Sequence, residues 1–310
     1  MTLGMINSCE EKLQNVGNGT SLGKDEFSYF SIISITICIV LFGLSLAVNG
    51  NALWVFICTS CRKKVYVFMM HLACIHLVFC TFIPVRLFLL ISRYLRSRNI
   101  PDICYLVTTS ESLYAFCTLW FYALTSMEQF LSVTKLQFGK KLRSTRLYHT
   151  VSIFVWLLAA AQMHIVMVAP KEKKASAWHQ LLSIIFGFLL PFVVIIIFYS
   201  HIINFLLTQQ ARGTCSVRRT PLRIIFTINC MLTVLFLPYH IAVGCIMLLK
   251  IRNPYTPMIL QSLALLMEAN SVLIFPIYAL ISKSFRKRFR SVFRYRKYLR
   301  RSNRSSSLTE

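Results

Sequence analysis

Seven long apolar segments determine what this chain can fold into. A helix rises about 1.5 Å per residue, so about 20 apolar residues cross the roughly 30 Å hydrocarbon core of a bilayer. The chain of 310 residues is 56% hydrophobic and 14% charged, and a soluble domain of this length would not carry so many such runs. We therefore predict an all-α integral membrane protein, a bundle of seven transmembrane helices. The segments span approximately residues 29–58, 65–92, 103–134, 147–169, 178–207, 221–249 and 256–281.

The Lys and Arg residues are distributed unequally between the two sides of the predicted bundle. The stretches that follow the first, third, fifth and seventh segments carry more than twice as many of them as the alternate stretches. Cytoplasmic loops carry the excess of basic residues, so the N-terminus is expected outside. The predicted parts are an extracellular N-terminus (1–28), a seven-transmembrane domain (29–281) and an amphipathic helix with a basic cytoplasmic tail (282–310). The formal net charge of +24 then indicates attraction to anionic lipid rather than to nucleic acid.

The third segment carries a glutamate near each end, Glu111 and Glu128. Their separation of seventeen residues corresponds to about 25 Å along a helix, close to the thickness of the hydrocarbon core. Carboxylates inside a membrane are costly and usually mark functional sites. We expect one end to receive a signal and the other end to report it.

Short motifs mark five of the segments. They are Gly50-Asn51 in the first, Trp156 in the fourth, Pro191 with Tyr199 in the fifth, Phe236-Leu237-Pro238-Tyr239 in the sixth, and Tyr278 followed by Phe285 in the seventh and beyond. With these motifs and the spacing from Cys104 to Glu128, the chain resembles a rhodopsin-like (class A) G-protein-coupled receptor over roughly residues 30 to 290. The Phe-Leu-Pro-Tyr-His form and the Pro-Val-Arg of the second segment are most similar to the branch that contains nucleotide, lipid and many orphan receptors.

The resemblance implies a multi-pass plasma-membrane receptor that binds an unidentified extracellular ligand and activates a heterotrimeric G protein, with arrestin as a further partner. It implies no cofactor and no metal ion. An enzyme is not indicated, because the sequence has no phosphate-binding loop, zinc-ligand spacing or nucleophile elbow. Two alternatives stay open. One is a non-signalling decoy or trafficking partner, and the other is a transporter, although the inverted repeats of many transporters are not found.

The resemblance places ionisable side chains around one outer chamber. They are Arg86, Glu111 and Glu268, with His164 and His240 on the walls. One interpretation is a structural ion pair between Arg86 and Glu111, because charges inside a membrane usually pair. Such a pair leaves the second carboxylate to be protonated, hydrated or occupied by a cationic group. The other interpretation is a ligand site, in which the glutamates suit a polar or cationic ligand, whereas Arg86 and basic rim residues suit an anionic one. The rim residues are Arg93, Arg96, Lys171 and Lys173.

Polar residues at the midplane depart from the family pattern. His76 replaces the aspartate that usually binds sodium, and Ile274-Phe275 replaces the Asn-Pro of the seventh-helix motif, with Pro276 displaced by one residue. Because imidazole is a poor sodium ligand, we predict no sodium site. We expect His76 to hold the second, third and seventh helices together by hydrogen bonds, and a proton sensor is the alternative. The midplane residues are His76, Thr118, Asn270 and Ser271.

The inner end of the third segment lacks the arginine that in the family engages the G protein. Glu128-Gln129-Phe130 stands where the family has Asp-Arg-Tyr, so Gln129 cannot form the ion pair that restrains resting receptors. Glu128 is expected to pair with a basic residue such as Arg143 or Arg146. The two consequences that fit are raised basal signalling, which we favour, and weak coupling. The residues expected to act in activation and G-protein coupling are Glu128, Gln129, Tyr199, Phe236, Pro238 and Tyr278.

The N-terminal stretch and the tail carry further candidate sites. Asn18 begins a glycosylation sequon. The family's disulfide partner for Cys104 is absent from the stretch between the fourth and fifth segments, and Cys9 is the remaining outer candidate. In the tail, phenylalanines spaced four apart among basic residues predict a membrane-surface helix held by anionic lipid. Candidate phosphorylation sites that would suit arrestin are Ser302, Ser305, Ser306, Ser307 and Thr309.

Overall fold

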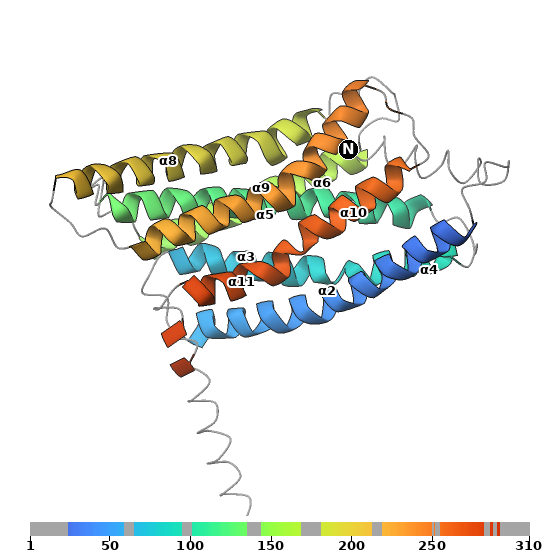
Figure 1. The fold of residues 1–310 in the computed structure, drawn as a ribbon, viewed down its shortest axis with the longest axis horizontal. Coiled ribbons are helices and arrows are strands. Elements are labelled where there is room, and N and C mark those ends of the chain that lie inside the picture. The colour runs from blue at the N-terminus through green and yellow to red at the C-terminus, as the bar shows by residue number, and fades with distance from the viewer. Residues whose placement is uncertain are drawn as a thin grey trace, which may run out of the picture.

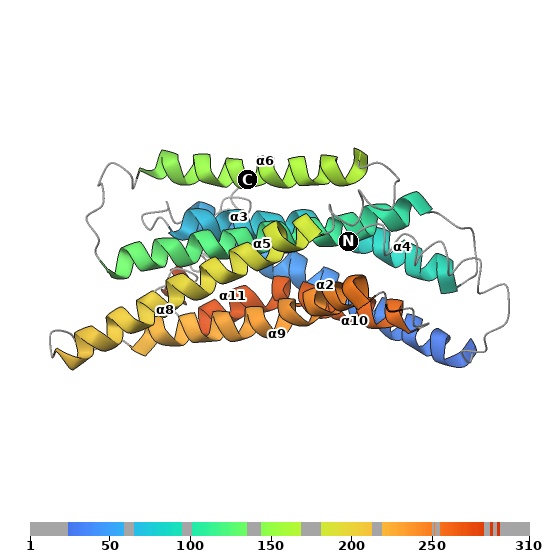
Figure 2. The same cartoon turned by 90° about the horizontal axis from the view of Figure 1, so that it is seen from above.

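The computed structural model describes residues 24–58, 65–94, 101–134, 144–168, 181–212, 219–249, 251 and 255–281, with residues 286, 287, 290 and 291 of the tail. Its helices lie side by side in one elongated bundle (Figure 1, Figure 2). The elements are α2 (Lys24–Cys58), α3 (Val65–Cys80), α4 (Ile83–Tyr94), α5 (Pro101–Val133), α6 (Thr145–Val168), η2 (Ile185–Leu189), α8 (Leu190–Ala211), α9 (Arg219–Leu249), α10 (Thr256–Glu268) and α11 (Asn270–Ile281).

The expected all-helical bundle is confirmed for the described residues. Each predicted segment corresponds either to one continuous helix or to two helices separated by a short break. A helix satisfies its backbone hydrogen bonds internally, which apolar surroundings require, so long apolar segments form helices here. The side of the membrane on which the N-terminus lies and the helix expected after residue 281 stay predictions.

The second predicted segment is divided into α3 and α4. Thr81 and Phe82 form a tight turn in which their N–H groups bond to the carbonyls of Val78 and Phe79, at 3.2 and 3.0 Å. The break precedes Pro84, which has no N–H to donate and disfavours helical geometry in the residue before it. Regular helical bonding has resumed where the Arg86 N–H bonds to the Phe82 carbonyl at 3.0 Å. The turn therefore sets the direction in which α4 presents its arginine.

The seventh predicted segment is divided at Ala269 into α10 and α11. The Ala269 N–H is shared between the carbonyls of Leu265 and Leu266, at 3.1 and 3.2 Å, which is typical of a tightened helical end. Glu268 is the last residue of α10 and Asn270 is the first of α11. The break thus lies between the two polar residues that the sequence assigns to the outer chamber and to the midplane.

A π-helical turn precedes α8. In such a turn the regular hydrogen-bond ladder is disturbed, and π turns are frequent at functional sites. Here the carbonyl of Phe186 accepts a hydrogen bond of 3.1 Å from Nε1 of Trp120 in α5. The next helical residues include Phe188, which is buried against the bundle interior. The turn therefore joins η2 to α5 and fixes an aromatic ring inside the bundle.

α5 is the central helix of the bundle. It packs against α3, α4, α6, η2 and α8, while α2 packs against α3, α4 and α11, and α9 packs against α10 and α11. The largest fully buried side chains are aromatic rings, among them Phe121, Tyr122, Tyr199, Phe236 and Tyr239. The interior is therefore built around α5, which carries both glutamates of the third predicted segment.

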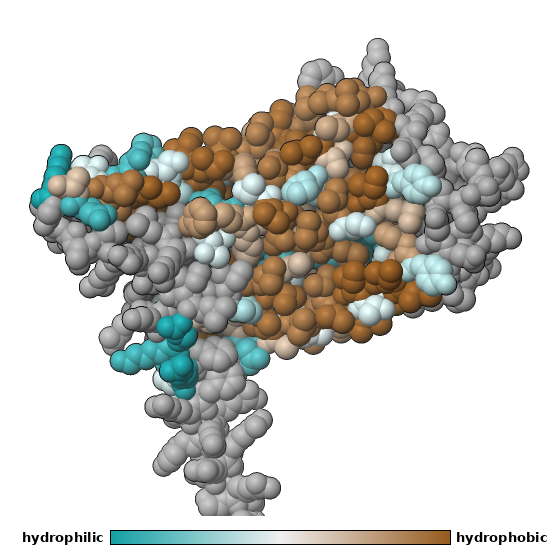
Figure 3. Space-filling view, in the orientation of Figure 1, coloured by the Kyte–Doolittle hydropathy of each residue, from teal (hydrophilic) through white to brown (hydrophobic). Residues whose placement is uncertain are grey.

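The outward surface of the bundle is apolar along most of its length. Figure 3 shows a continuous hydrophobic face with polar residues concentrated near one end, over the end of α8 and the described tail residues. Five of the described helical stretches are long and apolar enough to span a membrane: 29–57, 66–88, 181–211, 226–246 and 258–276. Large exposed apolar side chains such as Trp54, Leu157 and Val234 are therefore suited to contact lipid tails.

Candidate functional site

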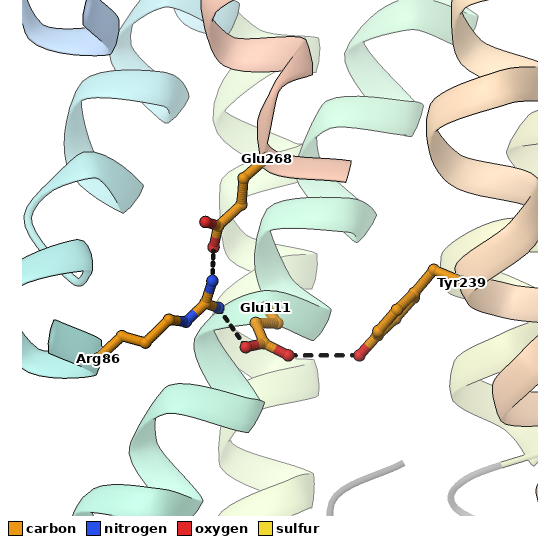
Figure 4. A network of polar contacts seen from close by, with 4 residues as sticks. All are labelled: Arg86, Glu111, Tyr239 and Glu268. Atoms are coloured by element: carbon orange, nitrogen blue, oxygen red, sulfur yellow. Dashed lines mark hydrogen bonds and ion pairs between the residues drawn. The ribbon is translucent and has the colours of Figure 1, made fainter. Parts of the chain in front are cut away.

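Arg86 of α4 lies between two carboxylates from different helices (Figure 4). Its Nη2 donates a hydrogen bond to Oε1 of Glu111 on α5. Its Nη1 lies 2.7 Å from Oε1 of Glu268 on α10, a contact that is an ion pair without hydrogen-bond geometry. The Arg86 and Glu111 side chains are only 7% and 9% exposed. We call these three residues the Arg86 cluster.

The Arg86 cluster corrects one step of the sequence argument. In one of the two interpretations of the sequence, Arg86 paired with Glu111 alone and the other carboxylate was left without the arginine. In the structure the guanidinium contacts both carboxylates, because its two terminal nitrogens face different helices. With one guanidinium and two carboxylates, the ionised cluster carries one negative charge in excess. The second glutamate is therefore paired, but the cluster is not electrically balanced.

Tyr239 of α9 joins the Arg86 cluster, which the sequence argument did not foresee. Its hydroxyl donates a long hydrogen bond, 3.4 Å, to Oε2 of Glu111, the oxygen that Arg86 does not bind (Figure 4). The Tyr239 side chain is fully buried. The residue belongs to the Phe-Leu-Pro-Tyr-His motif inside an apolar segment. A tyrosine hydroxyl buried there needs an acceptor, and this need was the one indication in the sequence that Tyr239 has a polar partner. Glu111 thus connects α5 to α4 and to α9.

A small cavity borders the Arg86 cluster. Its volume is about 20 Å³, which accommodates about one water molecule and is far below the roughly 300–1,000 Å³ of a pocket for an organic ligand. Ser45, Ser110 and Ser271 are among its lining residues. Oε2 of Glu268 is buried and has no hydrogen-bond partner within the part of the chain that the structure describes. A larger ligand therefore reaches these groups only if the cluster opens.

Of the two histidines assigned to the outer chamber, the structure describes only the side chain of His240, which lies apart from the Arg86 cluster. The His240 ring stacks on Phe188, with centroids 4.0 Å apart and planes inclined by 10°, and its Nδ1 lies 2.8 Å from the Phe236 carbonyl. It does not line the cavity beside Arg86. The side chain of His164 lies outside the described residues. Of the five predicted chamber residues, the structure therefore brings together Arg86, Glu111 and Glu268.

His76 and Asn270 form the centre of a midplane network. Nδ1 of His76 is 2.9 Å from Oδ1 of Asn49 in α2, and its Nε2 is 3.5 Å from Nδ2 of Asn270 in α11. Asn270 also accepts a hydrogen bond from the Tyr122 hydroxyl at 3.0 Å and donates one to the Tyr114 hydroxyl at 3.3 Å. This pattern matches a neutral imidazole that donates through Nδ1 and accepts through Nε2. The histidine thus connects α3 with α2 and α11, while its contact with α5 is the ring of Tyr114, with centroids 5.8 Å apart.

The other midplane candidates are also buried. Nδ2 of Asn49 donates to the Ser271 carbonyl at 2.9 Å, so Ser271 takes part through its backbone. Thr118 on α5 is fully buried. Asn49, Tyr114 and Tyr122 were not assigned to this network from the sequence. Asn49 immediately precedes the Gly50-Asn51 motif, but nothing in its spacing identifies its partner.

Asn270→Ala is expected to destabilise the folded chain by about 1–3 kcal/mol, because it removes the shared partner of Tyr122, Tyr114 and His76. The measurement is thermal unfolding of the purified chain in detergent. Asn51→Ala is the matched control, since the hydrogen bond of the Asn51 side chain among the described residues is local, to the carbonyl of Ala47 at 2.8 Å. Equal losses of stability in the two variants would contradict the central role of Asn270.

The C-terminal end of α5 is organised around Glu128. Its carboxylate accepts a hydrogen bond from the hydroxyl of Tyr148 on α6, a partner that the sequence argument missed. Of the basic residues expected to pair with it, Arg146 is exposed, and Arg143 lies outside the described residues. Gln129 is half-buried beside it. A tyrosine hydroxyl therefore binds the Glu128 carboxylate, and the ion pair with a basic residue stays a prediction.

The remaining activation residues fall partly inside the described structure. Tyr199 of α8 and Phe236 of α9 are buried, and Pro238 lies inside α9. The side chains of Tyr278 and Cys104, and residues Cys9 and Asn18, lie outside the described residues, as does most of the predicted tail helix. The disulfide, the glycosylation site and the tail helix therefore stay predictions.

Comparison with known proteins decides the family. The family described as 7 transmembrane receptor (rhodopsin family) matches residues 48–278, most of the chain. The chain belongs to the rhodopsin family of seven-transmembrane receptors. The resemblance drawn from the motifs is confirmed. The protein is accordingly a multi-pass plasma-membrane receptor and not a member of an enzyme family.

Several receptors are similar to this one over much of their length. The N-arachidonyl glycine receptor of Rattus norvegicus is 30% identical over 292 residues, covering 87% of this chain and 86% of that receptor. The human N-arachidonyl glycine receptor is 27% identical over 305 residues, covering 91% and 89%. The uracil nucleotide/cysteinyl leukotriene receptor of Rattus norvegicus is 27% identical over 221 residues, covering 66% and 64%. These relatives agree with the receptor branch that the sequence motifs indicate.

Proposed function

We propose that this receptor binds its extracellular ligand at the Arg86 cluster and transmits the signal to a heterotrimeric G protein. The observation that supports the site is the burial of two carboxylates and one guanidinium at the junction of α4, α5 and α10. Ionisable groups inside a membrane bundle are costly and mark ligand or ion sites. The family supplies the expectation of an extracellular ligand and a G protein.

The charge of the Arg86 cluster favours a ligand group that is cationic or donates hydrogen bonds. Arg86 is already engaged by both glutamates, whereas the carboxylates are in excess by one. An entering anion would increase the buried negative charge, and an entering cation would neutralise it. The names of the relatives make N-arachidonyl glycine the first compound to compare with amine-bearing compounds. A response to N-arachidonyl glycine that depends on Arg86 but not on Glu111 would reverse this preference.

The test of the proposed site is a ligand screen on cells that express the full chain, with G-protein dissociation as the readout. For an agonist that binds at the carboxylates, Glu111→Gln is expected to raise the half-maximal concentration by about 10- to 100-fold, because a charge-assisted hydrogen bond is lost. Ser262→Ala on the exposed side of α10 serves as the control. An unchanged response of Glu111→Gln at equal surface expression would remove the Arg86 cluster from the ligand site.

A non-signalling decoy or trafficking receptor is the competing outcome of the same screen. It predicts ligand binding to the chain without G-protein dissociation for any G protein. Gln129 is the residue that supports a non-signalling receptor, since it stands where the family has the arginine that engages the G protein. We place raised basal signalling ahead of it, because loss of that arginine also removes a restraint on the resting state.

The cytoplasmic partners beyond the G protein are also proposals. Basic residues of the tail are suited to bind anionic lipid, and phosphorylation of the tail serines would add negative charge that weakens this contact and suits arrestin. Glycosylation at Asn18 and a Cys9–Cys104 disulfide complete the proposed outer features.

A further inference from the structure

We infer that Tyr239 restrains α9 in the resting receptor by binding Glu111, and that a ligand group which takes over Glu111 releases α9. The inference rests on the proposed receptor function and adds a regulatory role to the same site. It assigns to the outer half of α9 a restraint that related receptors place at the inner end of the third helix.

The first support is the position of Tyr239 next to a weak point of α9. Pro238 lies inside this helix, where it removes one backbone hydrogen bond and favours a kink. Tyr239 and His240 follow it directly. A helix with such a hinge changes direction at low cost, so contacts made just beyond the hinge determine how its two halves are oriented.

The second support is that both residues after the hinge are held by other elements. The Tyr239 hydroxyl donates to Oε2 of Glu111 on α5. The His240 ring lies flat on Phe188 of η2, with ring centroids 4.0 Å apart. Both side chains are buried, at 0% and 6% exposure. The hinge region is therefore attached on two sides, by one hydrogen bond to a charged group and by one aromatic stack.

The third support is that the hydrogen bond from Tyr239 ends on a charged network. Oε1 of Glu111 is occupied by Arg86, and Arg86 also contacts Glu268. Through Glu111, α9 is thus connected to α4, α5 and α10. A charged ligand donor that approaches Oε2 of Glu111 displaces Tyr239, because the hydrogen bond from Tyr239 is long, 3.4 Å, and its donor is neutral. Ligand binding and release of α9 are coupled by this competition.

The fourth support is the residue at the inner end of α5. Gln129 carries no charge, so the arginine-based restraint of the family is missing there. A receptor that still has a resting state requires contacts elsewhere that favour it. The buried link from Tyr239 to the Arg86 cluster is such a contact, and it acts on the same helix.

Tyr239→Phe is the direct test, since it keeps the ring and removes only the hydroxyl. Amide hydrogen exchange of the purified full chain is measured over residues 226–246, together with ligand-independent G-protein dissociation in cells. We expect faster exchange in this part of α9 and basal signalling raised by about 3- to 10-fold, the range that loss of one hydrogen bond gives. Glu111→Gln is expected to accelerate the same amides, and the double variant is expected to add little to either single one.

Tyr122→Phe is the matched control for the exchange measurement. It also removes a buried tyrosine hydroxyl, but one that bonds to Asn270 of α11 rather than to Glu111, so α9 is expected to exchange at the wild-type rate. Unchanged α9 exchange in both Tyr239→Phe and Glu111→Gln would overturn the inference. Accelerated exchange without any G-protein response supports the restraint and counts against the proposed signalling function, so the two failures are distinguishable.

Discussion

Arg86→Ala is expected to destabilise the receptor by about 3–5 kcal/mol, more than loss of either glutamate, because it leaves two buried carboxylates without a counter-charge. The side chains of the pair Arg86–Glu111 are less than a tenth exposed, so solvent offers little compensation. The measurement is the melting temperature of the purified chain in detergent, together with the fraction of the chain that reaches the cell surface.

The matched control for Arg86→Ala removes the charges of Arg86, Glu111 and Glu268 together. Arg86→Met combined with Glu111→Gln and Glu268→Gln replaces the buried ion cluster by neutral groups of similar size, which is often neutral for stability or even stabilising. We expect this triple variant to recover most of the melting temperature that Arg86→Ala loses, while it no longer responds to ligand. If Arg86→Ala melts like the natural chain, the three residues do not form the buried network described above.

Gln129→Arg is expected to lower ligand-independent signalling by about 3- to 10-fold at equal surface expression. The introduced guanidinium would lie beside Glu128, whose carboxylate is buried and receives a hydrogen bond from Tyr148. An ion pair there would add the resting-state restraint that the natural residue does not provide. The readout is G-protein dissociation without added ligand, divided by the number of receptors at the surface.

Gln129→Ala separates the added charge from loss of the amide. It is expected to leave basal signalling near that of the natural chain, since it supplies no cation. A rise of signalling in Gln129→Arg would contradict the expectation and would indicate that the natural chain couples weakly because it lacks the arginine contact with the G protein.

The helical fold was predictable because the membrane imposes a simple rule. Apolar stretches long enough to cross a bilayer form helices, and the predicted segments agree with the helices to within a few residues. The breaks within the second and seventh segments were harder to predict from the sequence. Pro84 gives a signal for the turn between α3 and α4, but Ala269 carries no turn signal, and its break depends on local bonding to Leu265 and Leu266.

The candidate site was predictable in its members but not in its connections. Charged residues inside apolar segments are conspicuous, so Arg86, Glu111 and Glu268 were identified from the sequence. That one guanidinium contacts both carboxylates depends on the directions of α4 and α10 after their breaks. Sequence also gives no means to choose Tyr239 for Glu111 or Tyr148 for Glu128, because a tyrosine inside an apolar segment is ordinary until its hydroxyl is placed in three dimensions.

The most direct measurement of the central claim is nucleotide exchange on purified heterotrimeric G proteins by the full chain reconstituted in lipid vesicles. We expect exchange above that of empty vesicles without ligand, a further increase with an agonist found in the ligand screen, and loss of most of the agonist-dependent increase in Glu111→Gln. Exchange no faster than with empty vesicles, for every G-protein class and with ligand bound, would contradict the claim that this receptor transmits a signal from the Arg86 cluster to a G protein.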